Sequence, residues 1–310
     1  MSKQVTIQVL TWNNFSDTHK LLSSFGRLNY DNYQVTVVDN HSTDDSISKL
    51  EKDFPDYRYI FNSENKKYSG GTNFGVEDAL SDSAEYLFLL NNDTEIIDPN
   101  TLNKLTSILD SHPEISVVSC TAYYPDSSLQ TDVNKLIFPS IPYFFKKNSL
   151  FGFVIAKISN KIGVSKDGDK IYKMVDWVPT GITLFRKSIF TKLLFSNSFP
   201  MEFSDVDFCK RMRVLLGVGA TALADVKILH TNNFPDHITK SLKNFSRAKK
   251  SEFLFIKTYH SYLYYVLYKS LVLLNSTFLL IFLIPLSINN RYNKLRILNY
   301  FNLLKNIFTL

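Results

Sequence analysis

Cysteine is scarce in this chain, and so are the signatures of several common classes of protein. Cys120 and Cys209 are the only two cysteines among 310 residues. This number argues against a disulfide framework and against a zinc site made of cysteines. The N-terminus, MSKQVTIQVL, has no charged-then-apolar segment and enters a strand pattern almost at once. Without a signal segment, the protein is expected to stay inside the cell.

Two phosphate-binding fingerprints are also missing. The glycine-rich residues 65–75, NKKYSGGTNFG, match neither GxGxxG nor GxxxxGK[ST]. This disfavours dinucleotide-dependent oxidoreductases and P-loop nucleoside triphosphatases. A nucleotidyltransferase is disfavoured because the N-terminus lacks a glycine-rich triphosphate loop with Lys or Arg. The net charge of +6 favours anionic partners, but nucleic acid is not expected, because no basic stripe is interleaved with aromatic residues.

What the chain does have is an unbroken apolar run at residues 86–93, YLFLLNND, which ends on Asn91, Asn92 and Asp93. A continuous apolar run of this length is typical of a strand buried on both faces of a parallel sheet. The carboxyl ends of central strands face the ligand crevice of an open α/β sheet. Asp93 is therefore the first candidate for a functional residue.

Strand patterns alternate with helical patterns along the first 240 residues. The strands are expected at residues 5–11, 35–39, 57–61, 86–93, 115–120, 175–179, 181–186, 220–224 and 226–230. Helices are expected at residues 17–28 with Ser16 as cap, at 47–54, after the glycines of 65–75, at 99–112, at 188–194, and at 204–216 with Ser204 as cap. This alternation predicts an α/β fold with a mostly parallel, doubly wound sheet. Residues 123–172 are expected to form a loose excursion over the crevice.

The last part of the chain has a different texture. Residues 271–288, LVLLNSTFLLIFLIPLSI, carry no charge and are close to the shortest length that spans a bilayer. Arg291, Lys294 and Arg296 follow. We expect a domain at residues 1–240 and a hydrophobic helical tail at 241–310 that lies on or re-enters a membrane rather than spanning it. The alternative is a helical appendage buried against itself or in a dimer interface.

Each candidate polar residue also has an ordinary structural explanation. Asp39 ends a strand, where Asp is a common turn residue. Asp205 and Asp207 lie in the first helical turn, where the helix dipole stabilises negative charge, and their spacing puts them on different faces. His230 closes an apolar strand, and a lone histidine is more often structural than a metal ligand. The glycine pair before the third helix allows amide groups to face a phosphate, but it also suits a turn.

The order of these pieces, more than any one of them, resembles the family-2 glycosyltransferases, especially the rhamnosyltransferase-like branch. The resemblance covers roughly residues 4–235 and is carried by VTIQVLTWNN, VVDNHSTDDS, NSENKKYSGGTNFG, YLFLLNNDTEI, VDWVPTGITLFRKSIF, FSDVDFCKRMRVLLG and ILHTNN. It implies the nucleotide-sugar-binding fold called GT-A and an inverting, metal-dependent transfer.

The resemblance also implies roles for particular residues. Asp93, the last residue of a DxD-like Asn-Asn-Asp, and His230 would hold Mg²⁺ or Mn²⁺ on the donor diphosphate. Asp205 would be the general base, although Ser204 stands where the family usually has Glu, and Glu202 is a nearby substitute. Trp177, Gly181 and Arg211 would line the acceptor side. The donor would contact Thr11, Asp39, Asn65, Gly70, Gly71, Asn73, Asn91 and Asn92, with Asp39 on the base.

The expected function is inverting transfer of a sugar, rhamnose from dTDP-rhamnose, to a hydroxyl of a growing, lipid-linked surface polysaccharide. The expected partners are the nucleotide-diphosphate sugar, a glycan or lipid-linked glycan acceptor, and the inner face of the cell membrane. The alternative, which Ser204 keeps open, is a catalytically silent nucleotide-sugar-binding scaffold of a glycan-assembly complex. A homo-oligomer is also left open.

Overall fold

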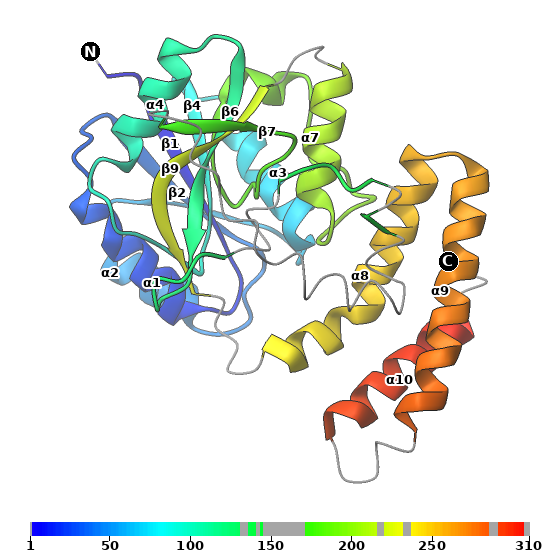
Figure 1. Cartoon of the computed structure of the whole chain (residues 1–310). Helices are drawn as coiled ribbons and strands as arrows, with labels where there is room; N and C mark the ends of the chain where they lie inside the picture. Colours follow the sequence, from blue (N-terminus) through cyan, green and yellow to red (C-terminus); the bar gives the residue numbers. More distant parts are fainter. Residues whose placement is uncertain are drawn as a thin grey trace. The chain divides into compact units, whose positions relative to one another are not determined.

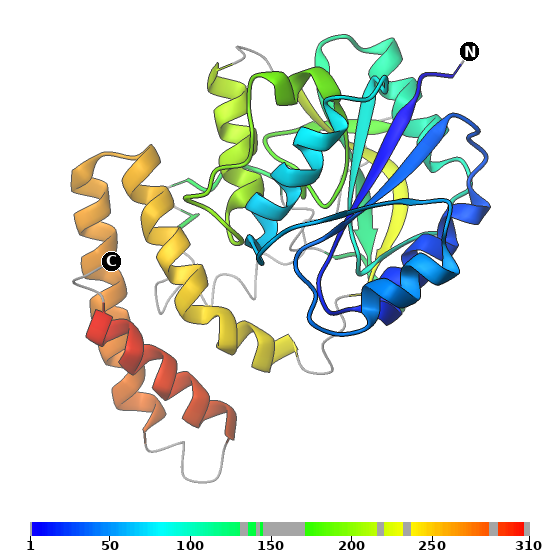
Figure 2. The ribbon, with the colours of Figure 1, turned by 180° about the vertical axis from the view of Figure 1, so that it is seen from behind.

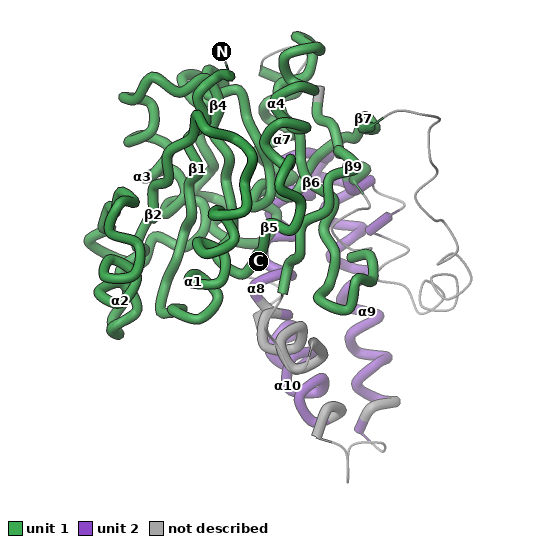
Figure 3. The backbone as a smooth tube through the Cα atoms, turned by 90° about the vertical axis from the view of Figure 1, so that its left-hand side faces the viewer, with its two compact units in different colours: residues 1–138, 167–233 green, residues 139–166, 234–310 purple. Residues whose placement is uncertain are grey.

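The computed structural model describes residues 2–130, 136–140, 143–144, 171–215, 220–231, 237–284 and 291–306. The chain divides into two compact units, Met1–Phe138 with Asp167–Asn233 (unit 1) and Pro139–Lys166 with Phe234–Leu310 (unit 2), as Figure 3 shows. This division lies near the boundary predicted after residue 240. Most of the predicted excursion at 123–172 and the end of the apolar segment, residues 285–288, lie outside the described residues.

Unit 1 is built on one mixed sheet (Figure 1). Its strands are β1 (Val5–Thr11), β2 (Tyr33–Asp39), β3 (Arg58–Phe61), β4 (Tyr86–Asn91), β5 (Thr94–Ile96), β6 (Ile115–Tyr123), β7 (Tyr172–Val175), β8 (Ile182–Arg186) and β9 (Ala220–His230). They follow the order β3-β2-β1-β4-β8-β6-β9-β5, with β7 also paired to β9. The predicted α/β class is confirmed.

The sheet changes character beyond β4. The pairs among β1, β2, β3 and β4 are parallel, as predicted. β8 is antiparallel to both β4 and β6, and β5 and β7 are antiparallel to β9. Among the described strands of this half, β6 and β9 alone are parallel. The mostly parallel sheet that the sequence predicts is therefore found among β1 to β4, and the sheet is mixed beyond β4.

Helices cover both faces of the sheet (Figure 2). α1 (Phe15–Ser24), α2 (Ser46–Asp53) and α4 (Thr101–Ser111) pack on one face, and α3 (Lys67–Ala79) and α7 (Ser204–Leu215) pack on the other. Tyr86, Phe88 and Leu90 of β4 enter the first core, while Leu87 and Leu89 enter the second. Successive side chains of a strand point to opposite faces, so the unbroken apolar run supplies both cores, as predicted.

Several local expectations are wrong. Asn14, not Ser16, caps α1 by accepting a hydrogen bond from the Asp17 amide. Ser204 is the first residue of α7, and its hydroxyl donates to the Met201 carbonyl at 2.7 Å. The two strands expected at 220–230 are one strand, β9, with register shifts opposite β6. The helix expected at 188–194 is a short 3-10 helix, Lys187–Thr191, and residues 176–179 are a loop.

α3 packs very closely on the sheet through two glycines. A Cβ atom on Gly71 would lie 2.8 Å from the Leu10 side chain, and one on Gly75 would lie 2.6 Å from Gln8 and Val38. Both distances are too short for real atoms, so side chains at these positions would push the helix off the strands. These glycines therefore serve helix packing.

Unit 2 contains α8 (His237–Tyr259), α9 (Tyr262–Leu283) and α10 (Arg291–Asn306), which agrees with the predicted helical tail. Ser261 caps α9 by accepting from the Tyr264 amide. The span Tyr262–Ile281 is long and apolar enough to cross a membrane, with a mean hydropathy of 1.4, and only 22% of it is buried. Most of this span is therefore exposed in the described part of the chain.

Candidate active site

The parallel register brings the carboxyl ends of β1, β2 and β4 to one edge of the sheet. Thr11 is the partner of Asp39, and Leu10 is the partner of Asn91. The polar residues that follow these strands in the sequence are therefore neighbours in space, as the sequence predicts.

Asn92 and Thr11 tie this edge together. The Asn92 amide donates to the hydroxyls of Thr11 and Thr18 at 3.2 and 3.1 Å, and these two hydroxyls lie 2.8 Å apart. Thr11 is only 1% exposed. This network fixes the turn that leads into Asp93. The contacts of Asn92 and Thr11 with the nucleotide sugar remain predictions.

The residues after β2 and β3 form a second network. Both carboxylate oxygens of Asp39 accept from the Ser42 amide, at 3.0 and 3.1 Å. Asn40 donates to Asn65 Oδ1 at 3.2 Å and to the Lys67 carbonyl at 3.0 Å. Asn40, which follows Asp39 directly after β2, thereby positions Asn65. Asp39 closes its own turn, and a carboxylate has lone pairs left for a further donor.

The N-terminus of α3 does not have the free amide groups that the glycine pair suggested. The amide of Lys67 donates to Asn65 Oδ1, that of Tyr68 to Met201 Sδ and that of Ser69 to the Pro200 carbonyl. The expectation that amide groups in the first turn of α3 face a phosphate is therefore wrong. Gly70 and Gly71 follow inside the helix.

Asn73 and Arg211 also have protein partners. Asn73 Nδ2 donates to the Phe195 carbonyl, and its Oδ1 accepts from the Phe195 amide, both at 2.9 Å. Arg211 donates to Asp207 Oδ2 at 2.8 Å and to the Leu194 carbonyl at 3.0 Å. Both side chains hold the loop before α7, and their predicted ligand contacts remain predictions.

The predicted metal ligands come together. Asp93 Oδ1 lies 3.2 Å from His230 Nε2, and their side chains are 24% and 15% exposed. Pairing of β5 with β9 sets Thr94 opposite His230, and the amide of Thr231 donates to the Asp93 carbonyl at 2.7 Å. One carboxylate and one imidazole suit a divalent ion that takes its remaining ligands from phosphate and water. No group of three or more His, Cys, Asp or Glu residues that could hold a metal exists among the described residues.

Gln130 belongs to this pair, although no sequence signal pointed to it. Its Oε1 lies 3.1 Å from His230 Nδ1, and its Nε2 donates to the His230 carbonyl at 2.7 Å. The two residues are 100 positions apart in the sequence.

Asp205 lies in the first turn of α7, and buried Thr180 holds it. The Thr180 hydroxyl and amide both donate to Asp205 Oδ1, the amide at 3.3 Å. Since that hydroxyl is already a donor, the Tyr68 hydroxyl, 2.8 Å away, must donate to it. Burial raises the pKa of Asp205 to about 6, and the Glu202 charge acts in the same direction. A pKa near the working pH is what a general base requires.

Asp207 has a different environment, as its spacing from Asp205 predicts. Its carboxylate is buried and paired with Arg211 four residues later. Asp207 is therefore a structural residue of α7, and Asp205 is the candidate for chemistry.

Gly181 links the Asp205 side of the site to the end of β4. The Asn91 amide donates to the Gly181 carbonyl at 2.7 Å, and a Cβ atom on Gly181 would overlap the Asn91 side chain. Trp177, on the same connecting segment, donates from Nε1 to the Ile137 carbonyl at 3.1 Å. The acceptor contacts predicted for Trp177 and Gly181 remain predictions.

Strained backbone gathers around this edge of the sheet. Five non-glycine residues of the described chain have positive φ, and four of them lie in segments that carry the candidate site: Asn13, His41, Lys67 and Phe203. Positive φ is unfavourable for a bulky residue such as Phe203, and such strain clusters at functional sites.

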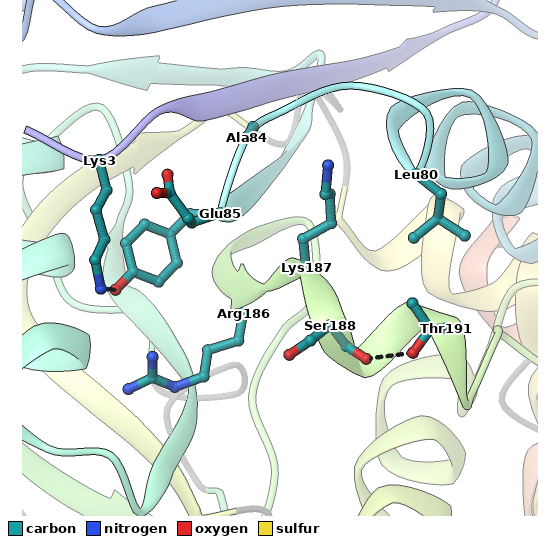
Figure 4. Close-up of a pocket in the computed structure, with 9 residues that line it drawn as sticks. Lys3, Leu80, Ala84, Glu85, Arg186, Lys187, Ser188 and Thr191 are labelled. Atoms are coloured by element: carbon teal, nitrogen blue, oxygen red, sulfur yellow. Dashed lines mark hydrogen bonds between the residues drawn. The ribbon is translucent and has the colours of Figure 1, made fainter.

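A pocket of about 370 Å³ lies at the opposite end of β4, next to Tyr86 (Figure 4). Its cations already have partners. Lys187 bonds to the Asp82 carboxylate at 2.8 Å, and Arg186 bonds to the carbonyls of Leu109 and Ile115. This pocket offers no free charge to an anionic ligand and is not the candidate site.

Comparisons with known proteins agree with this geometry. The family model described as "Glycosyl transferase family 2" matches residues 6–169. The "O-antigen biosynthesis protein RfbC" of Myxococcus xanthus is 30% identical over 115 residues, which are 35% of this chain and only 8% of that protein.

Among solved structures, the "Mannosyltransferase PcManGT from Pyrobaculum calidifontis in complex with GDP-Man and Mn2+" is similar, with a TM-score of 0.60 and 12% identity over 98% of this chain and 88% of that one. "S. aureus TarS 1-349 in complex with UDP-GlcNAc" has a TM-score of 0.52 and 14% identity, over 98% and 81% of the two chains. At these identities the likeness shows the GT-A-like fold alone.

Proposed function

The chain belongs to glycosyl transferase family 2 and is a glycosyltransferase, and we propose that it transfers a sugar with inversion from a nucleotide-diphosphate donor to a hydroxyl group. One observation carries this proposal: the candidate base and the candidate metal pair are both anchored to the end of β4. The Thr180 hydroxyl donates a hydrogen bond to Asp205. The carbonyl of the next residue, Gly181, accepts one from the amide of Asn91, and Asp93 lies two residues after Asn91.

On the donor side, Asp93 and His230 would hold Mg²⁺ or Mn²⁺. When bound, such an ion stabilises the negative charge that develops on the leaving diphosphate. Asn92, Thr11 and Thr18 keep the turn before Asp93 rigid, which preorganises the carboxylate. Asp39, Asn65, Gly70 and Gly71 lie on the segments we assign to the nucleotide.

On the acceptor side, Asp205 takes the proton of the acceptor hydroxyl. Both Thr180 hydrogen bonds fall on Oδ1, so we assign the proton to Oδ2. The acceptor oxygen then forms a bond to the anomeric carbon as the bond to the diphosphate oxygen breaks on the opposite face. One displacement inverts the anomeric centre, and no covalent enzyme intermediate is needed.

We infer that the sugar is rhamnose from dTDP-rhamnose and that the acceptor is a lipid-linked surface polysaccharide. The partial similarity to an O-antigen biosynthesis protein supports the polysaccharide. The two structural neighbours contain different donors, GDP-Man and UDP-GlcNAc. They therefore do not indicate which nucleotide this chain binds. The alternative remains a silent nucleotide-sugar-binding scaffold, because Ser204 occupies the position before the base.

We also infer that unit 2 holds the enzyme at the cytoplasmic face of a membrane. Large apolar side chains of α9 face outward; Leu263 is 65% exposed, Leu274 70% and Ile281 63%. An exposed apolar helix face with basic residues in the next helix suits the interface of an anionic bilayer. The lipid surface would then present a lipid-linked acceptor to the site.

The first experiment screens UDP-, dTDP- and GDP-sugars for release of nucleoside diphosphate with Mg²⁺ or Mn²⁺. We expect one donor to be hydrolysed slowly by the wild type, and this turnover to be lost on chelation and in Asp93→Ala and Asp205→Asn. Donor binding should persist in Asp205→Asn. A wild type that binds a donor and never turns it over, even with lipid-linked acceptors, would favour the scaffold. A chain that binds no donor would contradict both.

A further inference from the structure

Gln130 sits in a fixed position beside the candidate metal pair. It is 2% exposed, and its backbone amide donates to the Ala122 carbonyl at 3.1 Å. The residue before it, Leu129, forms a bridge with Tyr123 at the end of β6. The side chain thus projects from a short, backbone-bonded hairpin and cannot drift freely.

The orientation of the Gln130 amide follows from its partners. The group 2.7 Å from the His230 carbonyl must be the NH₂ group, because a carbonyl oxygen only accepts hydrogen bonds. The same NH₂ group lies 3.4 Å from the Tyr123 carbonyl, which is also only an acceptor. Oε1 therefore faces His230 Nδ1 at 3.1 Å, and since Oε1 cannot donate, Nδ1 must carry a proton.

This orientation decides what the other ring nitrogen presents. In a neutral imidazole with its proton on Nδ1, Nε2 carries a lone pair. That lone pair lies 3.2 Å from Asp93 Oδ1, so two electron-rich atoms face each other. Such an arrangement is unfavourable by itself and becomes favourable when a cation binds both atoms. With the proton on Nε2, the ring would instead donate a hydrogen bond to Asp93, and Nε2 would have no lone pair for a cation.

We propose that Gln130 is a positioning residue that fixes the Nδ1–H tautomer of His230 and so keeps Nε2 available to a divalent cation beside Asp93. The inference rests on the proposed function for the identity of that cation. Outer partners of this kind fix the tautomer of metal-binding histidines, and their loss typically weakens metal binding by about 10- to 100-fold.

The test reads the tautomer directly in metal-free protein with ¹⁵N-labelled histidine, by two-bond ¹⁵N–¹H correlation at pH 8.5. We expect Nδ1–H for His230 in the wild type. In Gln130→Met, which keeps the length and loses both polar atoms, we expect the proton to move to Nε2. Ser128→Ala, which removes only an exposed hydrogen bond to Asp126 in the same hairpin, is the matched control and should leave the tautomer of His230 unchanged.

The second readout is Mn²⁺ affinity, measured from the EPR signal of free Mn²⁺. We expect Gln130→Met to weaken binding by about 10- to 100-fold, while Ser128→Ala binds like the wild type. An Nε2–H ring in the wild type, or an unchanged tautomer and affinity in a folded Gln130→Met, would overturn the inference. A wild type with the Nδ1–H tautomer that binds no Mn²⁺ would uphold the positioning role and contradict the metal-dependent function instead.

Discussion

The central strand of unit 1 and helix α9 of unit 2 are both rich in leucine but differ in how much of it is exposed. In unit 1, Leu87 and Phe88 are fully buried, and the polar residues collect at the ends of strands. In unit 2, Leu263 and Leu274 of α9 are mostly exposed, while Lys249 and Glu252 of α8 are only 7% and 2% exposed. Exposed leucines follow one another along α9, and this pattern supports the membrane association proposed above.

Two carboxylates, one in each unit, have different partners as well. Glu252 is bonded to the Lys249 ammonium at 3.1 and 3.3 Å and accepts from the Tyr268 hydroxyl. Asp205 is held by a neutral hydroxyl and a backbone amide. A paired buried charge is a structural device, whereas a charge that burial disfavours is kept for chemistry. The substitutions below test the differences between the two units.

Asp205→Asn should have the largest effect, with opposite signs on activity and stability. We expect sugar transfer to fall by about 10²- to 10⁴-fold, because the proposed general base is lost. The pKa of Asp205 is raised from 3.8 to about 6, so ionisation costs stability progressively as the pH rises from about 4 to about 6. At 1.36 kcal/mol per pKa unit, the variant should be about 2–3 kcal/mol more stable than the wild type at pH 7.5.

Denaturation at several pH values checks this stability gain. The gain should vanish below pH 4, where the carboxyl group is protonated in both the folded and the unfolded protein. A variant that is stabilised equally at pH 4 and pH 7.5 would show that ionisation of Asp205 is not the cause.

Glu252→Leu should be the most damaging change in unit 2. It leaves the Lys249 ammonium buried without its carboxylate, which typically costs about 3–5 kcal/mol. Hydrogen exchange of α8 and α9 peptides should therefore become much faster. The double variant Lys249→Met/Glu252→Leu, which removes both charges, should recover most of the protection. If it remains as unprotected as the single variant, the damage comes from packing rather than charge.

Gly181→Ala should cost about 1–3 kcal/mol in unit 1, because the new methyl group overlaps the Asn91 side chain. Denaturant unfolding measures this cost, and donor hydrolysis should fall with it because the end of β4 shifts. Gly26→Ala is the matched control, since nothing lies within 4 Å of the added atom. Equal effects of the two alanines would show that the overlap at Asn91 is relieved at no cost.

Leu263→Ser and Leu274→Ser should give the smallest effect per residue. Each removes an exposed apolar side chain, and we expect binding to anionic liposomes to weaken by about tenfold for each, or about 1.4 kcal/mol. Donor hydrolysis in solution should be unchanged, because unit 1 is untouched. Unaltered liposome binding in the double variant would favour a protein contact on α9 over a lipid surface.

Much of unit 1 could be predicted because its signals are local. The alternation in residues 5–11 gives β1 with its observed bounds, and the run at 86–93 gives a strand buried on two faces. The placement of polar residues at strand ends then follows from the parallel register, which brings Thr11, Asp39 and Asn91 to one edge.

The rest depends on contacts between distant parts of the chain. Pro200 and Met201 accept hydrogen bonds from amides in the first turn of α3, although they lie more than 130 residues later in the sequence. No local sequence pattern predicts these hydrogen bonds. β5 and β7 have three and four residues, too few to show a period. The antiparallel β8 enters between β4 and β6 because packing sets strand order. Thr180 and Gln130 look like ordinary loop residues until the fold brings them to Asp205 and His230.

The anchoring of Asp93 and Asp205 to one strand end also bears on how such an enzyme can change over generations. β4 lies at the centre of the sheet with both faces buried, so its position is among the hardest in the molecule to alter. The loops that follow the strand ends are less buried and tolerate more substitutions. Sequence drift in those loops can exchange one sugar or acceptor for another, while the reacting groups keep the same spacing.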